Sequence, residues 1–227
     1  MTAGMCPVVQ HPSPNCGARR DDLVPRFVVL HYTAMDSAAA AISYLCDPNS
    51  QVSAHYVICK TGKITQLVGE GQRAWHAGAG EWFGLDDLNS RSIGIELDNN
   101  GQAPFQAALM NSLETLLTRI MAGWDIPPDH VIGHSDMAPG RKIDPGPLFD
   151  WQRLAKKGLA APLAPSPQPL EADPTLFRQR ARACGYTAPV DDAALLQAVR
   201  LRHRPLASGP LDPADIAALG VPTCSRP

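Results

Sequence analysis

Three short apolar runs, over residues 27–30, 92–97 and 131–134, constrain the fold of this chain most strongly. The first run is continuously apolar and rich in β-branched residues, which predicts a buried central strand. Helical patterns lie between the runs. Strands interleaved with helices predict an α/β fold, in which a mixed central β-sheet is flanked by helices.

The segments between these runs predict the other elements of the fold. Apolar side chains recur at three- and four-residue spacing over residues 104–123, which predicts an amphipathic helix that ends near Gly123. The first two dozen residues are rich in Pro, Asn, Gly and Arg and predict an irregular arm. The remaining expected elements are helices over residues 36–45 and 149–159, and a hairpin of strands over residues 55–59 and 64–68.

A change in composition divides the chain. Residues 161–172 are rich in alanine and proline, which is typical of an extended linker. We therefore expect an α/β domain over residues 1–160 and a small C-terminal three-helix module over residues 173–227. Its helices are predicted over residues 175–184, 193–202 and 213–219.

Charge and hydropathy exclude some partners. The formal net charge is -2, so nothing favours nucleic acid or an anionic membrane as a partner. Separately, we expect the protein to be a monomer. No apolar run approaches the roughly 20 residues of a membrane span. Residues 1–16 lack the pattern of a signal peptide, which favours a cytoplasmic location; removal of a leader would leave a periplasmic or envelope location open.

Histidine and carboxylate side chains suggest a metal site, whereas the six cysteines do not. The cysteines form no CxxC pair, so we expect mostly reduced thiols and no cysteine-bound zinc. His31 follows the first apolar run, and His134 and Asp144 bracket a loop stiffened by proline and glycine. Two histidines and one aspartate fill three positions of a catalytic zinc site and leave the fourth for water. Taken alone, His31 would be better explained as a hydrogen-bonded core histidine, and it is the presence of His134 and Asp144 that favours a metal ligand.

Two further residues suggest the chemistry of a hydrolase. Glu96 ends the apolar run over residues 92–97, and burial there would raise its pKa toward that of a general base. Gly94 lies on the same face of the strand and would leave room for substrate. Lys142 precedes Asp144 by two residues and could stabilise an oxyanion. Glu96 could instead form an ordinary ion pair with Arg91 or Lys142. Lys142 could instead be a solvated surface lysine or form an ion pair with Asp136 or Asp144.

Three residues are candidates for binding substrate. Tyr32 follows His31 directly and is expected to line the cleft. His76 lies in an aromatic loop and could contact substrate, bind the metal or cap the loop. Arg141, beside Lys142, is either structural or faces the substrate.

Several motifs, taken in order, closely resemble the type 2 family of zinc-dependent N-acetylmuramoyl-L-alanine amidases, whose domain architecture is shared by peptidoglycan recognition proteins. The motifs are His31-Tyr32-Thr33-Ala34, Val52-Ser53-Ala54-His55-Tyr56, Ala74-Trp75-His76-Ala77-Gly78, Ser92-Ile93-Gly94-Ile95-Glu96, and Gly133-His134-Ser135-Asp136 through Asp144-Pro145-Gly146. The resemblance covers about residues 20–160.

The resemblance implies hydrolysis of the amide between N-acetylmuramic acid, or its anhydro form, and the L-alanine of a peptidoglycan stem peptide. It implies that His31, His134 and Asp144 hold Zn²⁺, that Glu96 activates water and that Lys142 stabilises the transition state. The substrates would be peptidoglycan or muropeptide fragments in wall turnover or recycling. The C-terminal module resembles a helical peptidoglycan-binding module but could instead only brace the larger domain. The alternatives are a non-catalytic peptidoglycan-recognition protein and a zinc amidase for a different amide.

Overall fold

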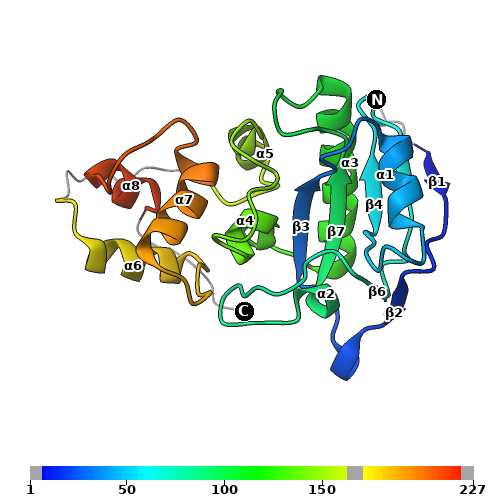
Figure 1. Cartoon of the computed structure of the whole chain (residues 1–227), viewed down its shortest axis with the longest axis horizontal. Coiled ribbons are helices and arrows are strands. Elements are labelled where there is room, and N and C mark those ends of the chain that lie inside the picture. Colours follow the sequence, from blue (N-terminus) through cyan, green and yellow to red (C-terminus); the bar gives the residue numbers. More distant parts are fainter. Residues whose placement is uncertain (1–6, 163–170, 221–227) are drawn as a thin grey trace.

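The computed structural model describes residues 7–162 and 171–220, and its centre is a mixed six-stranded sheet (Figure 1). In spatial order the strands are β1 (Val8–Gln10), β5 (Ile64–Gln66), β4 (Tyr56–Ile58), β7 (Ser92–Leu97), β3 (Phe27–Tyr32) and β8 (Val131–Gly133). Only the β4–β5 hairpin is antiparallel among these pairs. The predicted α/β fold with a mixed sheet is therefore confirmed.

The two central strands position the residues of greatest interest. β3 and β7 run in parallel, and their register pairs His31 with Glu96. The apolar residues before them are buried, since Phe27 and Ile95 have no exposed surface. The carboxyl ends of parallel strands lie at one edge of a sheet, so the two polar side chains emerge together there.

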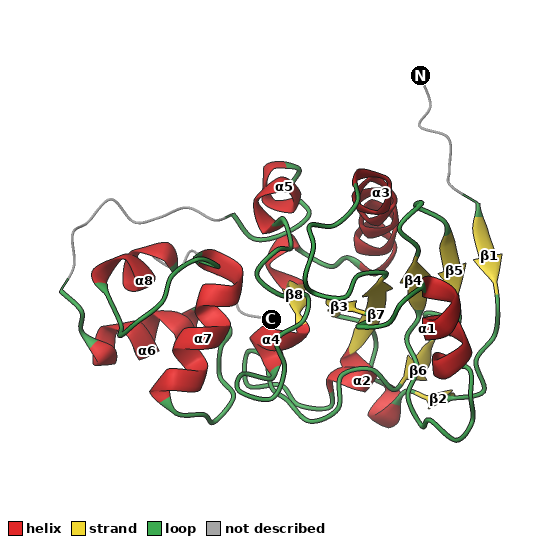
Figure 2. Cartoon of the chain, turned by 45° about the horizontal axis from the view of Figure 1, so that its top comes forward, coloured by secondary structure: helices red, strands yellow, loops and turns green. Residues whose placement is uncertain are grey.

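Helices cover the sheet (Figure 2). They are α1 (Ala38–Leu45), α2 (Leu88–Arg91), α3 (Ala107–Trp124), α4 (His134–Met137) and α5 (Trp151–Lys156), with two 3₁₀ turns at η1 (Arg20–Asp22) and η2 (Pro128–His130). The apolar stripe of α3 packs into the buried core, as its spacing predicts. The helix passes Gly123 and ends at Trp124, because Asp125 adopts the left-handed conformation that terminates helices, with a φ of 54°.

Two expectations are corrected. The N-terminal segment is not an irregular arm: β1 pairs with β5, and β2 (Cys16–Ala18) pairs with β6 (Gln72–Ala74) in a second, two-stranded sheet. Edge strands of three residues are too short to show a periodic pattern in the sequence. Helix α5 is shorter than the predicted span of residues 149–159 and is followed by Gly158, whose φ of 69° is left-handed.

Residues 171–220, the described part of the C-terminal region, form three helices, as predicted: α6 (Pro174–Ala183), α7 (Asp192–His203) and α8 (Pro213–Ala218). An aspartate caps the start of each. Figures 1 and 2 show α4 and α5 between the sheet and these helices. One buried apolar cluster joins Val29 and Met137 of the larger part to Phe177 and Leu195. The division at residues 160 and 172 stays a prediction, since residues 163–170 of the linker lie outside the described part.

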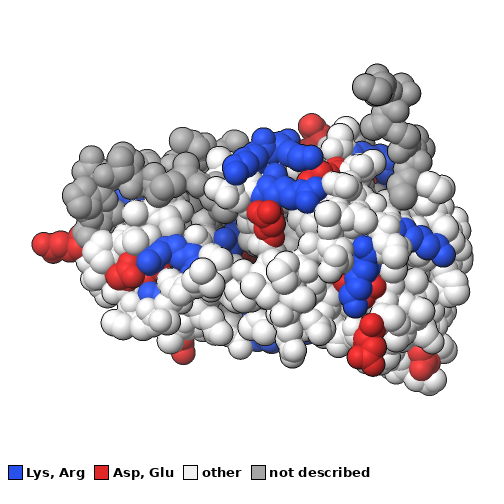
Figure 3. Space-filling model, turned by 90° about the horizontal axis from the view of Figure 1, so that it is seen from above, with Lys and Arg blue, Asp and Glu red and all other residues white. Residues whose placement is uncertain are grey.

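The surface is mixed in charge. Figure 3 shows side chains of both signs on one face, often side by side in small groups with uncharged surface between the groups. No helix within residues 7–162 and 171–220 is long and apolar enough to cross a membrane. The four cysteines of these ranges form no disulfide, and Cys6 and Cys224 lie outside them.

Candidate active site

Three residues from distant parts of the chain bring one ligand atom each to a single point. His31 Nδ1, at the end of β3, lies 2.9 Å from both His134 Nδ1 and Asp144 Oδ2. The last two atoms are 3.0 Å apart. All three residues are buried. The sequence-predicted ligands therefore converge, although 113 positions separate the first from the last.

The hydrogen bond that His134 makes on the side of its ring away from the other ligands fixes which ring nitrogen is unprotonated. His134 Nε2 lies 2.8 Å from the backbone oxygen of Ala77, which can only accept. Nε2 therefore carries the proton, and Nδ1 presents a lone pair to the other two ligand atoms.

A chain of hydrogen bonds fixes His31 in the same way. The Ser92 hydroxyl donates its one proton to the backbone oxygen of Leu88 at 2.5 Å, so it accepts from His76 Nε2 at 3.2 Å. His76 Nδ1 is then unprotonated and accepts from His31 Nε2 at 3.0 Å. The Nδ1 atom of His31 is therefore unprotonated and presents a lone pair, like that of His134.

This arrangement suits a tetrahedral metal ion. Two nitrogen lone pairs and a carboxylate oxygen that face one another within 3.0 Å repel unless a cation lies between them. Ligand bonds of about 2.0–2.1 Å at tetrahedral angles place the ligand atoms about 3.3 Å apart, close to the separations seen here. Burial lowers the pKa of His31 to about 4, which keeps the ring neutral and able to bind a metal at neutral pH.

Glu96 lies beside this triangle and lines the same cleft, whose volume is about 540 Å³. Burial raises its pKa well above the usual value, and the negative charge of Asp144 adds to the rise. Within the described residues, Glu96 Oε2 is buried without a hydrogen-bond partner. The ion pairs considered from the sequence are not formed there, and this carboxylate oxygen keeps an unused acceptor position beside the cleft.

The remaining predicted residues also line the cleft. Lys142 is exposed and forms no ion pair with the described aspartates, and its charge opposes the rise in the pKa of Glu96. Arg141 donates to the backbone oxygens of Ala77 and Ala79 and so braces the loop beneath His134. Tyr32 stands at the rim of the cleft, half-buried.

The expectation that Gly94 leaves room for substrate was wrong. The space beside Gly94 holds the imidazole of His76, because a Cβ built on Gly94 would lie 2.4 Å from His76 Cγ. Gly94 therefore admits a histidine that orients His31, and substrate does not occupy that space. His76 still borders the cleft, so its predicted contact with substrate stays open.

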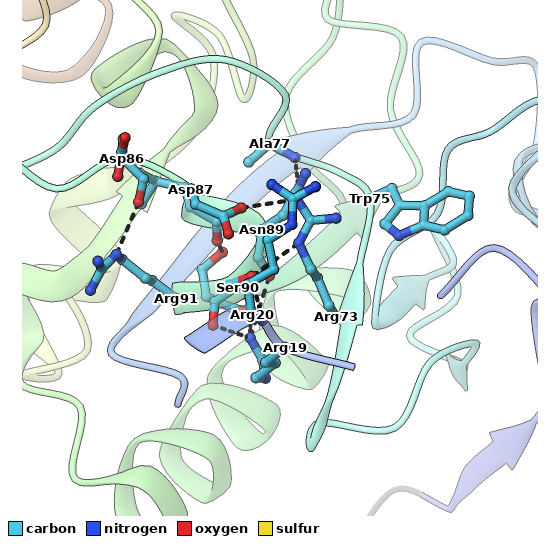
Figure 4. A network of polar contacts seen from close by, with 12 residues as sticks. Arg19, Arg20, Arg73, Trp75, Ala77, Asp86, Asp87, Asn89, Ser90 and Arg91 are labelled. Atoms are coloured by element: carbon cyan, nitrogen blue, oxygen red, sulfur yellow. Dashed lines mark hydrogen bonds and ion pairs between the residues drawn. The ribbon is translucent and has the colours of Figure 1, made fainter. Parts of the chain in front are cut away.

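Side chains that the sequence analysis missed hold this loop in place (Figure 4). Asn89 Oδ1 accepts from the backbone N–H groups of His76 and Ala77 at 2.9 and 2.8 Å. Arg19 donates to the backbone oxygens of Asn89 and Ser90 and fixes α2, which carries them. No sequence signal marks Asn89. Ser92 does have one, since the two-residue period of a strand places it on the face of Gly94 and Glu96.

Comparison with known proteins decides the family. The profile of the N-acetylmuramoyl-L-alanine amidase family Amidase_2 matches residues 21–147, which is more than half of the chain. The chain belongs to this family. The matched segment contains all eight predicted site residues.

Curated relatives agree with the family match. The chain is 43% identical over 152 residues to the N-acetylmuramoyl-L-alanine amidase AmiD of Escherichia coli, covering 60% of this chain and 54% of AmiD. It is 45% identical over 104 residues to the 1,6-anhydro-N-acetylmuramyl-L-alanine amidase AmpD of Haemophilus influenzae, covering 45% of this chain and 56% of that protein. The chain thus spans about half the length of these two relatives.

A solved structure extends the match beyond the α/β domain. It is the complex of E. coli AmiD with the substrate anhydro-N-acetylmuramic acid-L-Ala-D-gamma-Glu-L-Lys, at a TM-score of 0.77 and 33% identity. It covers 88% of this chain and 89% of the AmiD chain, so the similarity continues into the C-terminal helices.

Proposed function

We propose that this protein is a zinc-dependent hydrolase of the amide bond between N-acetylmuramic acid, or its anhydro form, and the L-alanine of a peptidoglycan stem peptide. The observation that carries the proposal is the triangle of His31 Nδ1, His134 Nδ1 and Asp144 Oδ2 beside the unpartnered oxygen of Glu96. Membership of the amidase family supports the choice of bond.

Each side chain has a defined part in this proposal. His31, His134 and Asp144 would hold zinc, which supplies a Lewis acid that polarises the amide carbonyl and acidifies water. Glu96 takes a proton from the attacking water at its free oxygen and delivers it to the leaving nitrogen. The raised pKa of Glu96 increases its affinity for that proton. The ammonium of Lys142 stabilises the negative charge that develops on the amide oxygen.

The substrate and the organisation of the chain belong to the same proposal. The names of the relatives and the muropeptide bound to AmiD favour a muropeptide substrate. We further propose that the protein acts as a monomer. The α/β domain over residues 1–160 would carry the catalysis, and residues 173–227 would form the module joined to it by the linker over residues 161–172.

Mass spectrometry of the products tests the proposal directly. Zinc-loaded protein is incubated with soluble anhydro-muramyl peptide and, in parallel, with purified sacculi. We expect release of peptides that begin with a free L-alanine, abolished by a chelator and restored by added zinc. The preferred substrate separates recycling of soluble fragments from action on the polymeric wall.

His134→Ala provides the control for the metal, because it removes one ligand, and we expect this variant to lose zinc on dialysis. Retention of a full complement of zinc would refute the assignment of His134. Binding of sacculi without product release would favour a recognition protein.

A further inference from the structure

A buried ion pair joins the C-terminal helices to the segment that presents His134. Asp136 lies two residues after His134 and has no exposed surface. Arg202, on α7, is 6% exposed and places Nη1 2.7 Å from Asp136 Oδ2. Tyr186, from the loop before α7, donates its hydroxyl to Asp136 Oδ1 at 2.9 Å. Both side-chain partners of the carboxylate therefore come from the C-terminal region.

Asp136 in turn fixes the backbone at His134. Its Oδ2 atom accepts from the backbone N–H of Gly133 at 2.8 Å, and Gly133 is the residue at which β8 ends and α4 begins. An acidic side chain at the third helical position that bonds back to the capping residue locks the first turn of a helix. Here that turn begins with His134, so Asp136 sets the direction from which the ligand enters the site.

The same guanidinium supports the segment that carries Asp144. It lies over the ring of Trp151 at 4.0 Å and donates to the backbone oxygen of Val131 at 3.3 Å. Gly133 packs between Trp151 and Pro145, so closely that a Cβ there would lie 2.7 Å from Pro145 Cδ. Pro145 follows Asp144 directly. Arg202 thus contacts β8, α4 and α5, the elements that support the backbone on which His134 and Asp144 lie.

We propose that Arg202 is a positioning residue for the metal site, and that the C-terminal helices are needed for metal binding because they neutralise Asp136. Loss of Arg202 leaves a buried carboxylate without its cation, which is strongly unfavourable, so the turn at Gly133 must open to let Asp136 reach water. This opening releases the fixed direction of His134. This inference rests on the proposed zinc site and adds a role for the C-terminal helices that is independent of peptidoglycan binding.

A matched pair of variants on α7 tests the proposal in the full chain. Arg202→Gln breaks the contact with Asp136, whereas Arg200→Gln breaks an equally buried ion pair, with Asp215 at 2.6 Å, that lies wholly within the C-terminal helices. Zinc affinity is measured by competition with a chromophoric chelator, and the visible spectrum of the cobalt-loaded protein reports ligand geometry. We expect Arg202→Gln to weaken zinc binding on the order of 10-fold and to alter the cobalt spectrum, as is typical of supporting residues around a metal. Arg200→Gln should leave both unchanged at temperatures where it is folded.

Two further variants keep the test informative if Arg202→Gln does not fold. Tyr186→Phe retains the ring and removes only the hydrogen bond to Asp136, so we expect a smaller but measurable loss of zinc affinity. Asp136→Asn combined with Arg202→Gln removes the unpaired charge, and we expect it to regain part of the affinity.

The outcomes separate this inference from the proposed function. Equal loss of affinity in the Arg200 and Arg202 variants, or none in either, would overturn the positioning role while leaving the zinc site intact. Failure of the unaltered protein to bind zinc would overturn the proposed function itself.

Discussion

A single methyl group at Gly94 tests the arrangement that fixes His31. In Gly94→Ala the new Cβ would lie 2.4 Å from Cγ and 2.6 Å from Nδ1 of His76, where ordinary contacts begin at 3.4 Å. The ring must therefore retreat by about 1 Å or the strand must shift. His76 Nδ1 is also the acceptor for His31 Nε2 at 3.0 Å, so a displacement of that size breaks this hydrogen bond.

Two consequences of known size follow. Overpacking of a filled site costs about 1–3 kcal/mol of folding stability. Loss of the hydrogen bond that orients a metal-binding histidine costs about 10- to 100-fold in metal affinity. We therefore expect Gly94→Ala to unfold at a lower denaturant concentration and to bind zinc at least 10-fold more weakly.

Chemical denaturation and competitive zinc titration measure the two effects separately. Gly123→Ala is the control, because a Cβ there meets nothing within 4 Å, and alanine favours a helix over glycine. In the double variant Gly94→Ala, His76→Ala the clash is gone but the acceptor is also missing. Stability should recover while zinc affinity stays low. Wild-type zinc affinity in both Gly94 variants, the single and the double, would refute the inference that His76 orients His31.

Three other perturbations have defined outcomes. Glu96→Gln should retain zinc, as measured by metal analysis, yet lose about 10²- to 10⁴-fold in turnover, the usual contribution of a general base. Lys142→Ala removes a positive charge that lowers the pKa of Glu96. The turnover rate of this variant should fall, and the acid limb of its rate–pH profile should move to higher pH. An acid limb that does not move would contradict the coupling between the two charges. Burial lowers the pKa of His55 to about 3, against about 6.5 in the unfolded chain. Between these two pH values the unfolded state binds more protons than the folded state, so folding stability falls as the pH drops below about 6.5. His55→Gln should reduce the slope of unfolding free energy against pH by about 1.4 kcal/mol per unit between about pH 5.5 and about pH 4, measured in chelator; an unchanged slope would show that His55 does not resist protonation.

The sequence sufficed for the parts of this site that depend on local pattern. His31 and Glu96 each follow apolar runs, and two such strands in parallel necessarily deliver their ends to one edge of a sheet. The spacing predicts the helix now seen over residues 107–124, but it starts three residues later than expected and ends one residue later, since a left-handed Asp125 has no strong signature. The short edge strands at residues 8–10 and 16–18 were missed, because three residues carry no measurable period.

The supporting contacts could not be predicted because they depend on tertiary packing. Arg202 lies on an amphipathic helix of a basic and alanine-rich segment, where an arginine ordinarily faces solvent. Its burial against Asp136, 66 positions away, follows from the docking of α7 on α4 and leaves no trace in local sequence. Asn89 is hidden in the same way, since its two backbone partners belong to a loop that precedes it by 12 and 13 positions.

The geometry couples the proposed base to the proposed metal site through charge. The carboxylate of Asp144 raises the pKa of Glu96, and the ammonium of Lys142 lowers it. A divalent cation on the ligand triangle would offset the first of these effects, so Glu96 should lose its proton more readily once the metal is bound. Burial of Glu96 acts in the opposite direction and keeps its proton affinity above that of an exposed glutamate. In the proposed mechanism, metal binding would therefore be linked to activation of the base, and one loop supplies both of the charges that act on Glu96, those of Asp144 and Lys142.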